Sequence, residues 1–384
     1  MLFLVFLTGS AGAVKQLHDC LVFSYGSGAW TLNLNDGSVT ELCKGYNPQI
    51  SPDGKWLATC GSDIFLYDLA SMSKKKLTNF NFDLESDKGL IEYFWFSPDS
   101  KSIIYTLDGD IHLVKCDGSS NLLLTRLDEE AYSPCFSPQG NLIVYKIRGA
   151  ICIMKPDGSN NRDSILQEKG EVLYSPLFSK NGKKILYGVT NSEGHDRVGE
   201  FDLDTLEKKI VKCNDSYPRI GTYSPDGKMI LGVCDSAPFY MSRMGNGDSV
   251  HFLTDYPDWF NQPFYSVDGN TVEFIRDEAV GAKLNINILY NLLNVKKGVI
   301  NGIMWDECVF SDVLSSPDGK WLALGLWYAD DKHGNILLTT IDQSCQRFLI
   351  ICTGVGSTGT PSFAPSLING KLLDYYGNWH SLDE

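Results

Sequence analysis

The sequence predicts an all-β protein built from four-stranded antiparallel sheets that repeat along the chain. Three observations predict it: a Ser-Pro-Asp-Gly-type turn recurs, short strand-like runs follow each copy, and Asp-Gly hairpin signals separate later runs. The serines of the turn stand 40 to 50 residues apart, and self-similarity at that period indicates a repeat architecture. The seven copies begin at Ser51, Ser97, Ser137, Ser179, Ser224, Ser266 and Ser316.

The first half of each unit is a strand, a turn and a second strand. An apolar segment ends at the serine and often carries a proline, as in Tyr46-Asn47-Pro48-Gln49-Ile50. In the turn, proline presets the first central position and Asp-Gly tolerates the left-handed corner. Runs of four or five branched and aromatic residues follow, such as 56–59 and 103–106. They are too short for helices and are typical of strands.

The second half of each unit is a hairpin. Third strands are expected at 64–67, 111–114 and 151–154, and Asp-Gly turns follow within 115–119 and 155–159. Fourth strands are expected to end at the Leu-Thr pairs 77–78, 124–125 and 253–254. Four antiparallel strands in about 44 residues describe one blade of a β-propeller.

We therefore expect a single closed propeller over residues 20–384, with eight blades favoured and seven as the alternative. Strand-like runs at 21–25, 30–34 and 39–42 precede the first turn, and an eighth, altered motif occupies 363–373. We expect the N- and C-terminal strands to share one blade, because closure removes the open sheet edges that invite pairing with other chains.

The repeats resemble those of a known family. Residues 111–119, Ile-His-Leu-Val-Lys-Cys-Asp-Gly-Ser, and the recurring Phe-Ser-Pro-Asp-Gly-Lys pattern are similar to the TolB-type β-propeller repeat. Related repeats occur in tricorn-like and prolyl-oligopeptidase-like propellers. The resemblance covers about residues 20–376 and implies the fold, whereas many functions are found on this scaffold.

Composition excludes some classes of function. Lys and Arg number 33 and Asp and Glu 47, so the formal charge is 33 − 47 = −14. This excess disfavours nucleic acid and anionic membrane surfaces as partners. The 11 cysteines include no CxxC pair, and no Cys/His cluster has zinc-ligand spacing, so we expect neither a metal nor a cofactor. No stretch approaches the roughly 18 apolar residues that span a bilayer, so we expect no integral membrane segment.

Residues 1–19 are interpreted as a signal peptide or an N-terminal extension. The apolar run 2–7 and the small residues Ala11-Gly12-Ala13 outline a secretory signal, which predicts a periplasmic or secreted protein of the cell envelope. The segment lacks a charged beginning, and the cysteines argue against an oxidising compartment. A cytoplasmic protein is therefore the alternative.

Two kinds of loop indicate a binding site at one face of the propeller. The loops between second and third strands are acidic, and Asp277, Asp330 and Asp331 are the candidates there. The loops between blades are aromatic, and Tyr256, Trp259 and Trp305 are the candidates there. We predict a monomeric, non-catalytic scaffold that binds a protein or peptide partner, and the acidic loops favour basic partners.

Two other functions are compatible with the sequence. A propeller enzyme, either a metal-assisted lyase or a hydrolase, would place its site in the central channel, and His195 and His333 beside acidic residues are its candidates. A purely structural envelope protein is the third reading. The Gly354-Val355-Gly356-Ser357-Thr358-Gly359 segment fits a dinucleotide pattern, but Pro361 follows where a helix is required. No GxSxG nucleophile elbow is present.

Overall fold

The computed structural model describes part of the chain. The described residues are 4–7, 20–25, 28–33, 39–61, 63–80, 91–125, 131–159, 162–167, 169–194, 196–211, 218–224, 226–234, 237–242, 250–252, 259–260, 264–265, 271–279, 286–294, 299–305, 308–315, 321–328, 333–340, 348–355, 361–363, 371–373 and 379–381. The regular elements in these ranges are all β-strands. No helix among them is long and apolar enough to cross a membrane.

The first six sheets are four-stranded and antiparallel, and their strands follow chain order. They consist of β1 (Leu4–Leu7), β2 (Cys20–Tyr25), β3 (Gly28–Asn33) and β4 (Val39–Lys44); β5 (Tyr46–Ile50), β6 (Trp56–Cys60), β7 (Ile64–Asp68) and β8 (Lys74–Lys76); β9 (Ile91–Phe96), β10 (Ser102–Leu107), β11 (Asp110–Lys115) and β12 (Asn121–Leu123); β13 (Ala131–Phe136), β14 (Ile143–Ile147), β15 (Ala150–Met154) and β16 (Arg162–Leu166); β17 (Val172–Phe178), β18 (Lys184–Thr190), β19 (Asp196–Asp202) and β20 (Lys208–Val211); and β21 (Pro218–Tyr223), β22 (Met229–Cys234), β23 (Ala237–Ser242) and β24 (Val250–Phe252).

The remaining described strands form two five-stranded sheets and one pair. They consist of β25 (Trp259–Phe260), β26 (Phe264–Tyr265), β27 (Thr271–Ala279), β28 (Ile286–Asn294) and β29 (Val299–Trp305); β30 (Cys308–Ser315), β31 (Trp321–Tyr328), β32 (His333–Thr340), β33 (Phe348–Val355) and β34 (Pro361–Phe363); and the pair β35 (Lys371–Leu373) and β36 (Trp379–Ser381).

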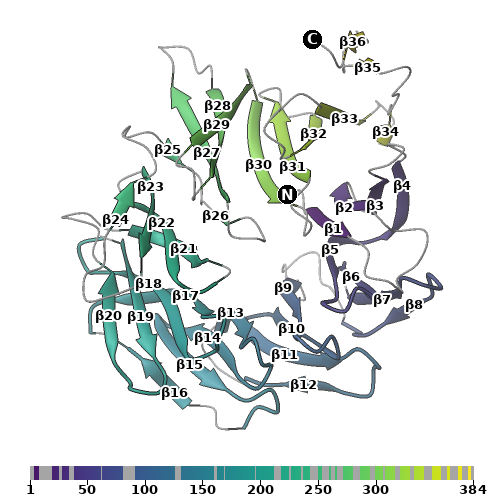
Figure 1. Cartoon of the computed structure of the whole chain (residues 1–384). Coiled ribbons are helices and arrows are strands. Elements are labelled where there is room, and N and C mark those ends of the chain that lie inside the picture. Colours follow the sequence, from purple (N-terminus) through teal and green to yellow (C-terminus); the bar gives the residue numbers. More distant parts are fainter. Residues whose placement is uncertain are drawn as a thin grey trace.

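The sheets follow one another around a common centre, as Figure 1 shows. First strands such as β5, β9 and β13 lie on the inner side, and fourth strands such as β8, β12 and β16 lie on the outer side (Figure 1). Consecutive sheets from β1–β4 to β30–β34 contact each other, and β1 of the first sheet lies beside β30. The all-β propeller architecture expected from the repeats is therefore confirmed, whereas the blade number and the closure of the ring stay predictions.

The first sheet differs from our expectation of a blade shared by the two chain ends. Its inner strand is β1, which pairs with β2 so that Leu4 is opposite Phe23 and Leu7 is opposite Cys20. In the described C-terminal residues, β35 and β36 pair with each other instead. The apolar run that resembles a signal sequence also has the branched and aromatic residues of a strand, which explains why it can fill this position.

The recurring serine closes the turn between the first and second strands. The Ser51 hydroxyl donates to Asp53 Oδ1 over 2.6 Å and accepts a hydrogen bond from the Trp56 N–H over 2.9 Å. Asp53 Oδ1 also accepts from the Lys55 N–H over 3.1 Å, and Gly54 takes the left-handed corner with φ 70°. The same bonds recur in the Ser97, Ser179 and Ser224 turns, where asparagine replaces aspartate in the second of these three. The motif is thus a turn tied by its own side chains.

The proline of the first strand coincides with a β-bulge. Asn47 and Pro48 together stand opposite Thr59, and Asn47 has φ 53°. Ser133 and Ser175 precede proline in their own strands and have φ of 53° and 45° at the matching bulges. A bulge bends its strand and increases the local twist, so these residues shape the inner strands.

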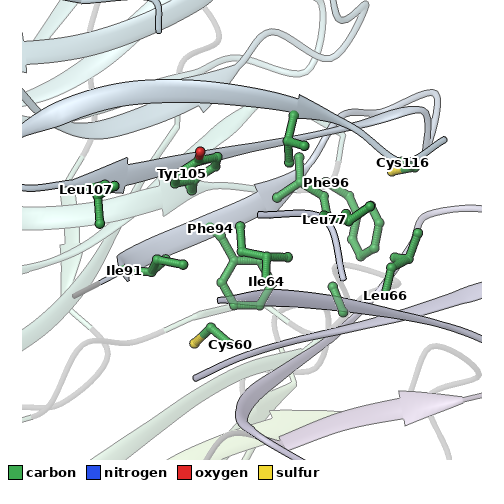
Figure 2. Packing of buried hydrophobic residues seen from close by; sticks show 13 residues of the cluster. Cys60, Ile64, Leu66, Leu77, Ile91, Phe94, Phe96, Tyr105, Leu107 and Cys116 are labelled. Carbon is green, nitrogen blue, oxygen red and sulfur yellow. The ribbon is translucent and has the colours of Figure 1, made fainter. Parts of the chain in front are cut away.

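The hydrophobic core lies between neighbouring sheets. In Figure 2, Ile64 and Leu66 of one sheet pack against Phe94, Phe96 and Tyr105 of the next. Strand β10 is buried along its whole length because its two faces meet different neighbours: Tyr105 belongs to this cluster, whereas Ile104 packs with the sheet β13–β16. Each sheet therefore depends on both adjacent sheets for its core.

Candidate functional site

Three of the six predicted binding residues lie in described strands. Trp259 begins β25, Asp277 lies in β27, and Trp305 ends β29. Tyr256, Asp330 and Asp331 lie outside the described residues. The site is therefore built here from the three residues that can be placed.

These three residues occupy one row across a single sheet. Trp259 is the register partner of Asp277, Asp277 is the partner of Ile288, and Ile288 is the partner of Trp305. The row, which we call the Trp–Asp row, joins strands β25, β27, β28 and β29. Residues that are separated by up to 46 positions in the sequence (305 − 259) thus lie side by side in the sheet.

The Trp–Asp row lies near the edge where second strands end. Asp277 is two residues before Ala279, the end of β27, and the Ser266 turn precedes the other end of this strand. Because antiparallel strands reverse direction, the start of β25 and the end of β29 meet this same edge. The row therefore lies near the end of the sheet from which the loop between its second and third strands leaves, and acidic loops were expected at this end of the propeller.

One acidic residue of the loops between second and third strands, Asp63, has a structural role. The Asp63 side chain is 3% exposed and accepts hydrogen bonds from Thr78 Oγ1 over 3.0 Å and from the Phe80 N–H over 2.9 Å. Lys76 forms an ion pair with the same carboxylate over 2.8 Å. Asp63 therefore holds the end of the fourth strand, and it contributes little to the attraction of a ligand.

The same arrangement recurs in the next sheet and explains the repeated Leu-Thr pairs. Thr125 Oγ1 donates to Asp110 Oδ1 over 3.2 Å and accepts from the Ile111 N–H over 2.8 Å. The Leu-Thr repeat is visible in the sequence, but its cause is not. The spacing of 15 residues between aspartate and threonine in both copies is the signal that could have shown it.

A group of aromatic rings surrounds His112 on the third strand of this sheet. The Tyr105 and His112 rings stack with centroids 5.0 Å apart, and the Phe80 ring meets His112 edge-on at 6.4 Å. Burial lowers the pKa of His112, and the nearby carboxylates of Asp110 and Asp108 oppose the shift. The imidazole is therefore neutral at neutral pH and packs as an aromatic ring.

Trp95 is the most exposed tryptophan whose side chain the structure describes. It lies on the inner strand β9 and is 52% exposed, while its register partner Ile104 is fully buried. Figure 1 shows β9 on the inner side of the sheets. Trp95 is not among the binding residues predicted from the sequence, because it stands between Phe94 and Phe96 and nothing in this aromatic run shows which ring is exposed.

A buried polar contact joins two neighbouring sheets. Glu200 of β19 is 6% exposed; it accepts a hydrogen bond from the Tyr223 hydroxyl over 2.8 Å and pairs with Lys184 Nζ over 3.0 Å. The equivalent third-strand positions are the apolar residues Leu113 and Ile153. The interface between these sheets thus contains a polar contact where earlier interfaces are apolar.

The residues expected for a channel metal are only partly placed. His195 lies outside the described residues, and His333 is the first residue of β32. Within the described ranges, no group of three histidine, cysteine, aspartate or glutamate residues is arranged to hold a metal ion. Cysteines 43, 60, 116, 135 and 152 are not joined in disulfides, and burial raises the pKa of the Cys43, Cys60, Cys116 and Cys135 thiols.

Comparisons with known proteins give relatives in structure alone. No protein-family model matches the chain, and no curated protein matches it. A dihydro-heme d1 dehydrogenase, NirN, has a TM-score of 0.64 at 14% identity, over 94% of this chain and 78% of that one. A putative dipeptidyl aminopeptidase IV from Bacteroides ovatus has a TM-score of 0.58 at 12% identity, over 84% of this chain and 57% of that one. An oligogalacturonate lyase in complex with manganese has a TM-score of 0.51 at 13% identity, over 67% of this chain and 81% of that one.

These matches support the propeller fold. Tricorn protease is also among them, with a TM-score of 0.53, in agreement with the resemblance of the repeats. Because all identities are below 20%, the likeness extends to the fold and leaves the function to be argued from the site.

Proposed function

We propose that this protein is a non-catalytic scaffold that binds a protein or peptide segment at the face containing the Trp–Asp row. The observation that carries the proposal is the alignment of Trp259, Asp277 and Trp305 in one row of a sheet. Tryptophan is enriched among residues that dominate binding energy at interfaces. A formal charge of −14 favours partners with basic side chains.

The test replaces Trp259 and Trp305 together with alanine and measures binding and stability side by side. We expect weaker capture of the native partner, identified by mass spectrometry, with little change in thermal unfolding. Leu206→Ala is the matched control, because Leu206 is 64% exposed in the turn between β19 and β20, at the other face. A collapse of stability in the double variant, or unchanged capture, would refute the proposal.

The proposed compartment is the periplasm or the exterior of the cell, and it has a separate test. Export with cleavage after Ala13 would remove β1, which pairs with β2 and lies beside β30. Mass spectrometry of the N-terminus of the protein purified from its native organism shows whether this segment is cleaved off or retained. A mature chain that begins after residue 13 supports export, and one that retains Leu4–Leu7 supports the cytoplasmic alternative.

The enzyme alternative is a metal-assisted lyase or hydrolase. Its test is metal analysis of the protein purified from its own source, together with the same analysis after His333→Ala. A stoichiometric metal that is lost in the variant would favour the enzyme over the scaffold.

A further inference from the structure

One turn of the repeat contains an asparagine where three other described turns contain an aspartate. In those three turns the serine hydroxyl and a main-chain N–H donate hydrogen bonds to Asp53, Asp99 and Asp226. In the Ser179 turn, Asn181 Oδ1 accepts both bonds instead, from the Ser179 hydroxyl over 2.8 Å and from the Lys183 N–H over 3.1 Å. An amide therefore takes the place of the usual carboxylate at this position.

The residue after Asn181 is held as glycine by two features of the turn. Gly182 takes the left-handed corner with φ 70°, a conformation that residues with a side chain rarely adopt. A Cβ atom added to Gly182 would also overlap Gln139 Oε1, which belongs to the neighbouring Ser137 turn. Asparagine in this turn is therefore followed by a glycine.

An Asn-Gly dipeptide can react with itself. The main-chain nitrogen of the glycine attacks Cγ of the asparagine and forms a new C–N bond, while the side-chain nitrogen and the glycine N–H proton leave as ammonia. Water then opens the cyclic imide at one of its two C–N bonds, which gives either aspartate or isoaspartate. Glycine permits the attack because it has no Cβ atom to obstruct the ring closure.

The folded turn holds both partners of this reaction. The Gly182 N–H donates to the Ser179 main-chain oxygen over 2.8 Å, and two hydrogen bonds fix the Asn181 side chain. The Ser179 hydroxyl also accepts the Lys184 N–H over 3.0 Å, and Ser179 is only 4% exposed. The attack therefore requires the turn to open first, whereas water reaches the exposed Asn181 freely.

The two products differ in how they fit the turn. Aspartate at position 181 presents the same acceptor oxygen that Asp99 presents to its own turn. Isoaspartate adds a methylene group to the main chain and shortens the side chain by one carbon. The hydrogen-bond spacing of the turn is then lost, so this product should destabilise the turn.

We propose that Asn181 is a site of spontaneous deamidation and that the closed Ser179 turn protects it. The aspartate product restores the residue found in the other turns and adds one negative charge at neutral pH. The isoaspartate product loosens the turn. The extent of deamidation therefore reports how often this turn opens.

The experiment incubates the full chain at mildly alkaline pH, folded and in guanidinium chloride, and follows the reaction by mass spectrometry. Chymotrypsin can cut after Phe178 and Tyr187, and peptide 179–187 contains Asn181 as its one asparagine. We expect deamidation to be at least about tenfold slower in the folded protein, because its rate follows the population of the open turn. Labelling by an isoaspartyl methyltransferase separates the two products.

Variants assign the protection to the serine hydroxyl. In Ser179→Ala the Lys184 N–H loses its acceptor and the turn opens more often, so we expect deamidation of Asn181 in the folded protein to be about tenfold faster. Ser97→Ala is the matched control, because it removes the equivalent hydroxyl from another turn. It should leave the rate at Asn181 unchanged.

The fit of the aspartate product has its own variant. The urea midpoint of Asn181→Asp at neutral pH should match that of the unmodified protein, whereas protein enriched in isoaspartate should unfold at lower urea. A large loss of stability in Asn181→Asp would show that the aspartate product does not fit the turn.

The proposal fails if Asn181 does not deamidate in guanidinium chloride, or if it reacts equally fast in the folded protein. An unchanged rate in Ser179→Ala, or an equal acceleration by Ser97→Ala, would show that the hydroxyl of this turn does not protect the site. If Ser179→Ala does not fold, the unmodified protein provides the same test in urea below its midpoint. The rate there should rise before global unfolding, and a constant rate would refute local opening.

Discussion

Ser97 illustrates how one side chain secures a repeat. It is 5% exposed, its hydroxyl donates to Asp99 Oδ1 over 2.6 Å, and the Ser102 N–H donates to that hydroxyl over 2.9 Å. The sequence predicted the turn, because Ser-Pro-Asp-Gly residues have turn propensities of their own. It did not predict these bonds, which depend on how the side chains fold back over the turn.

Removing this hydroxyl should destabilise the protein. Ser97→Ala leaves the buried N–H of Ser102 without its acceptor, so we expect a loss of about 1–3 kcal/mol in the free energy of unfolding. The measurement is urea unfolding followed by circular dichroism. The control is Ser192→Ala at an exposed loop position, which should be neutral. Equal midpoints for the two variants would contradict the role given to Ser97.

The aspartates of these turns should make stability depend on pH. Hydrogen bonds from the Ser97 hydroxyl and the Lys101 N–H lower the pKa of Asp99, although partial burial opposes the shift; the Ser224 turn lowers the pKa of Asp226 in the same way. A carboxyl whose pKa is lower in the folded state stabilises the fold above its unfolded pKa of about 4. This contribution is lost as the pH falls through the folded pKa.

In the double variant Asp99→Asn/Asp226→Asn, the free energy of unfolding should therefore fall less steeply as the pH decreases below about 4. Its stability at neutral pH should change little, because Asn181 already makes the same bonds in the Ser179 turn. The measurement is urea unfolding over a pH series from neutral to about pH 3. If stability falls equally steeply with decreasing pH in the variant and the unmodified protein, other carboxyl groups cause the pH dependence.

At the scale of the element, the fourth strand is held by a threonine that follows it. Thr78 Oγ1 accepts the Ile64 N–H over 2.9 Å and donates to the buried Asp63. Strand periodicity predicted where the strands begin and end, since apolar and branched residues mark them. The reason for the Leu-Thr pair was not predictable, because it requires two strands to be paired in register first.

Thr78→Val should destabilise this end of the strand, because valine keeps the shape of the threonine side chain but lacks its hydroxyl. The buried Ile64 N–H loses its acceptor, so we expect a cost of about 1–3 kcal/mol and faster hydrogen exchange at Ile64. Thr40→Val, at an exposed strand position, is the control. Unchanged exchange at Ile64 would mean that the hydroxyl does not secure the strand.

The first strand shows a limit of reading elements from sequence. Residues 4–7 satisfy both a signal sequence and a β-strand, because each requires a short apolar run. The choice between the two depends on whether a partner strand is available. In the structure β2 supplies it, and no local pattern could have shown this pairing.

At the scale of the whole molecule, stability comes from the interfaces between sheets. Most described interfaces are apolar, and the interface at Glu200 and Tyr223 is polar. Removing one partner of a buried polar contact is costly, whereas replacing both with apolar groups can be neutral. The repeat itself offers the replacements, since leucine or isoleucine and phenylalanine occupy the matching positions elsewhere.

Tyr223→Phe should therefore lower the free energy of unfolding by about 1–2 kcal/mol, because Glu200 loses a hydrogen bond. The double variant Glu200→Leu/Tyr223→Phe should recover part of this loss. Thermal and urea unfolding of both variants provide the comparison. If the double variant is less stable than Tyr223→Phe alone, the polar contact contributes more than an apolar interface would.

The sequence suggested candidate binding residues one by one and did not predict how they are arranged. The sequence suggested Trp259, Asp277 and Trp305 as members of aromatic and acidic loops, whereas the structure has all three in strands. Their alignment in one row results from strand register over a span of 46 residues, which sequence periodicity does not contain. The unit-by-unit repeat predicted the architecture because each blade follows the same local rules.

Hydrogen exchange with mass spectrometry, in the presence and absence of the captured native partner, tests the central claim most directly. The account predicts new protection at the start of β25, the end of β27 and the end of β29, with none at the Ser51 and Ser97 turns. Protection at those turns, or at β9 around Trp95 instead of the Trp–Asp row, would contradict it.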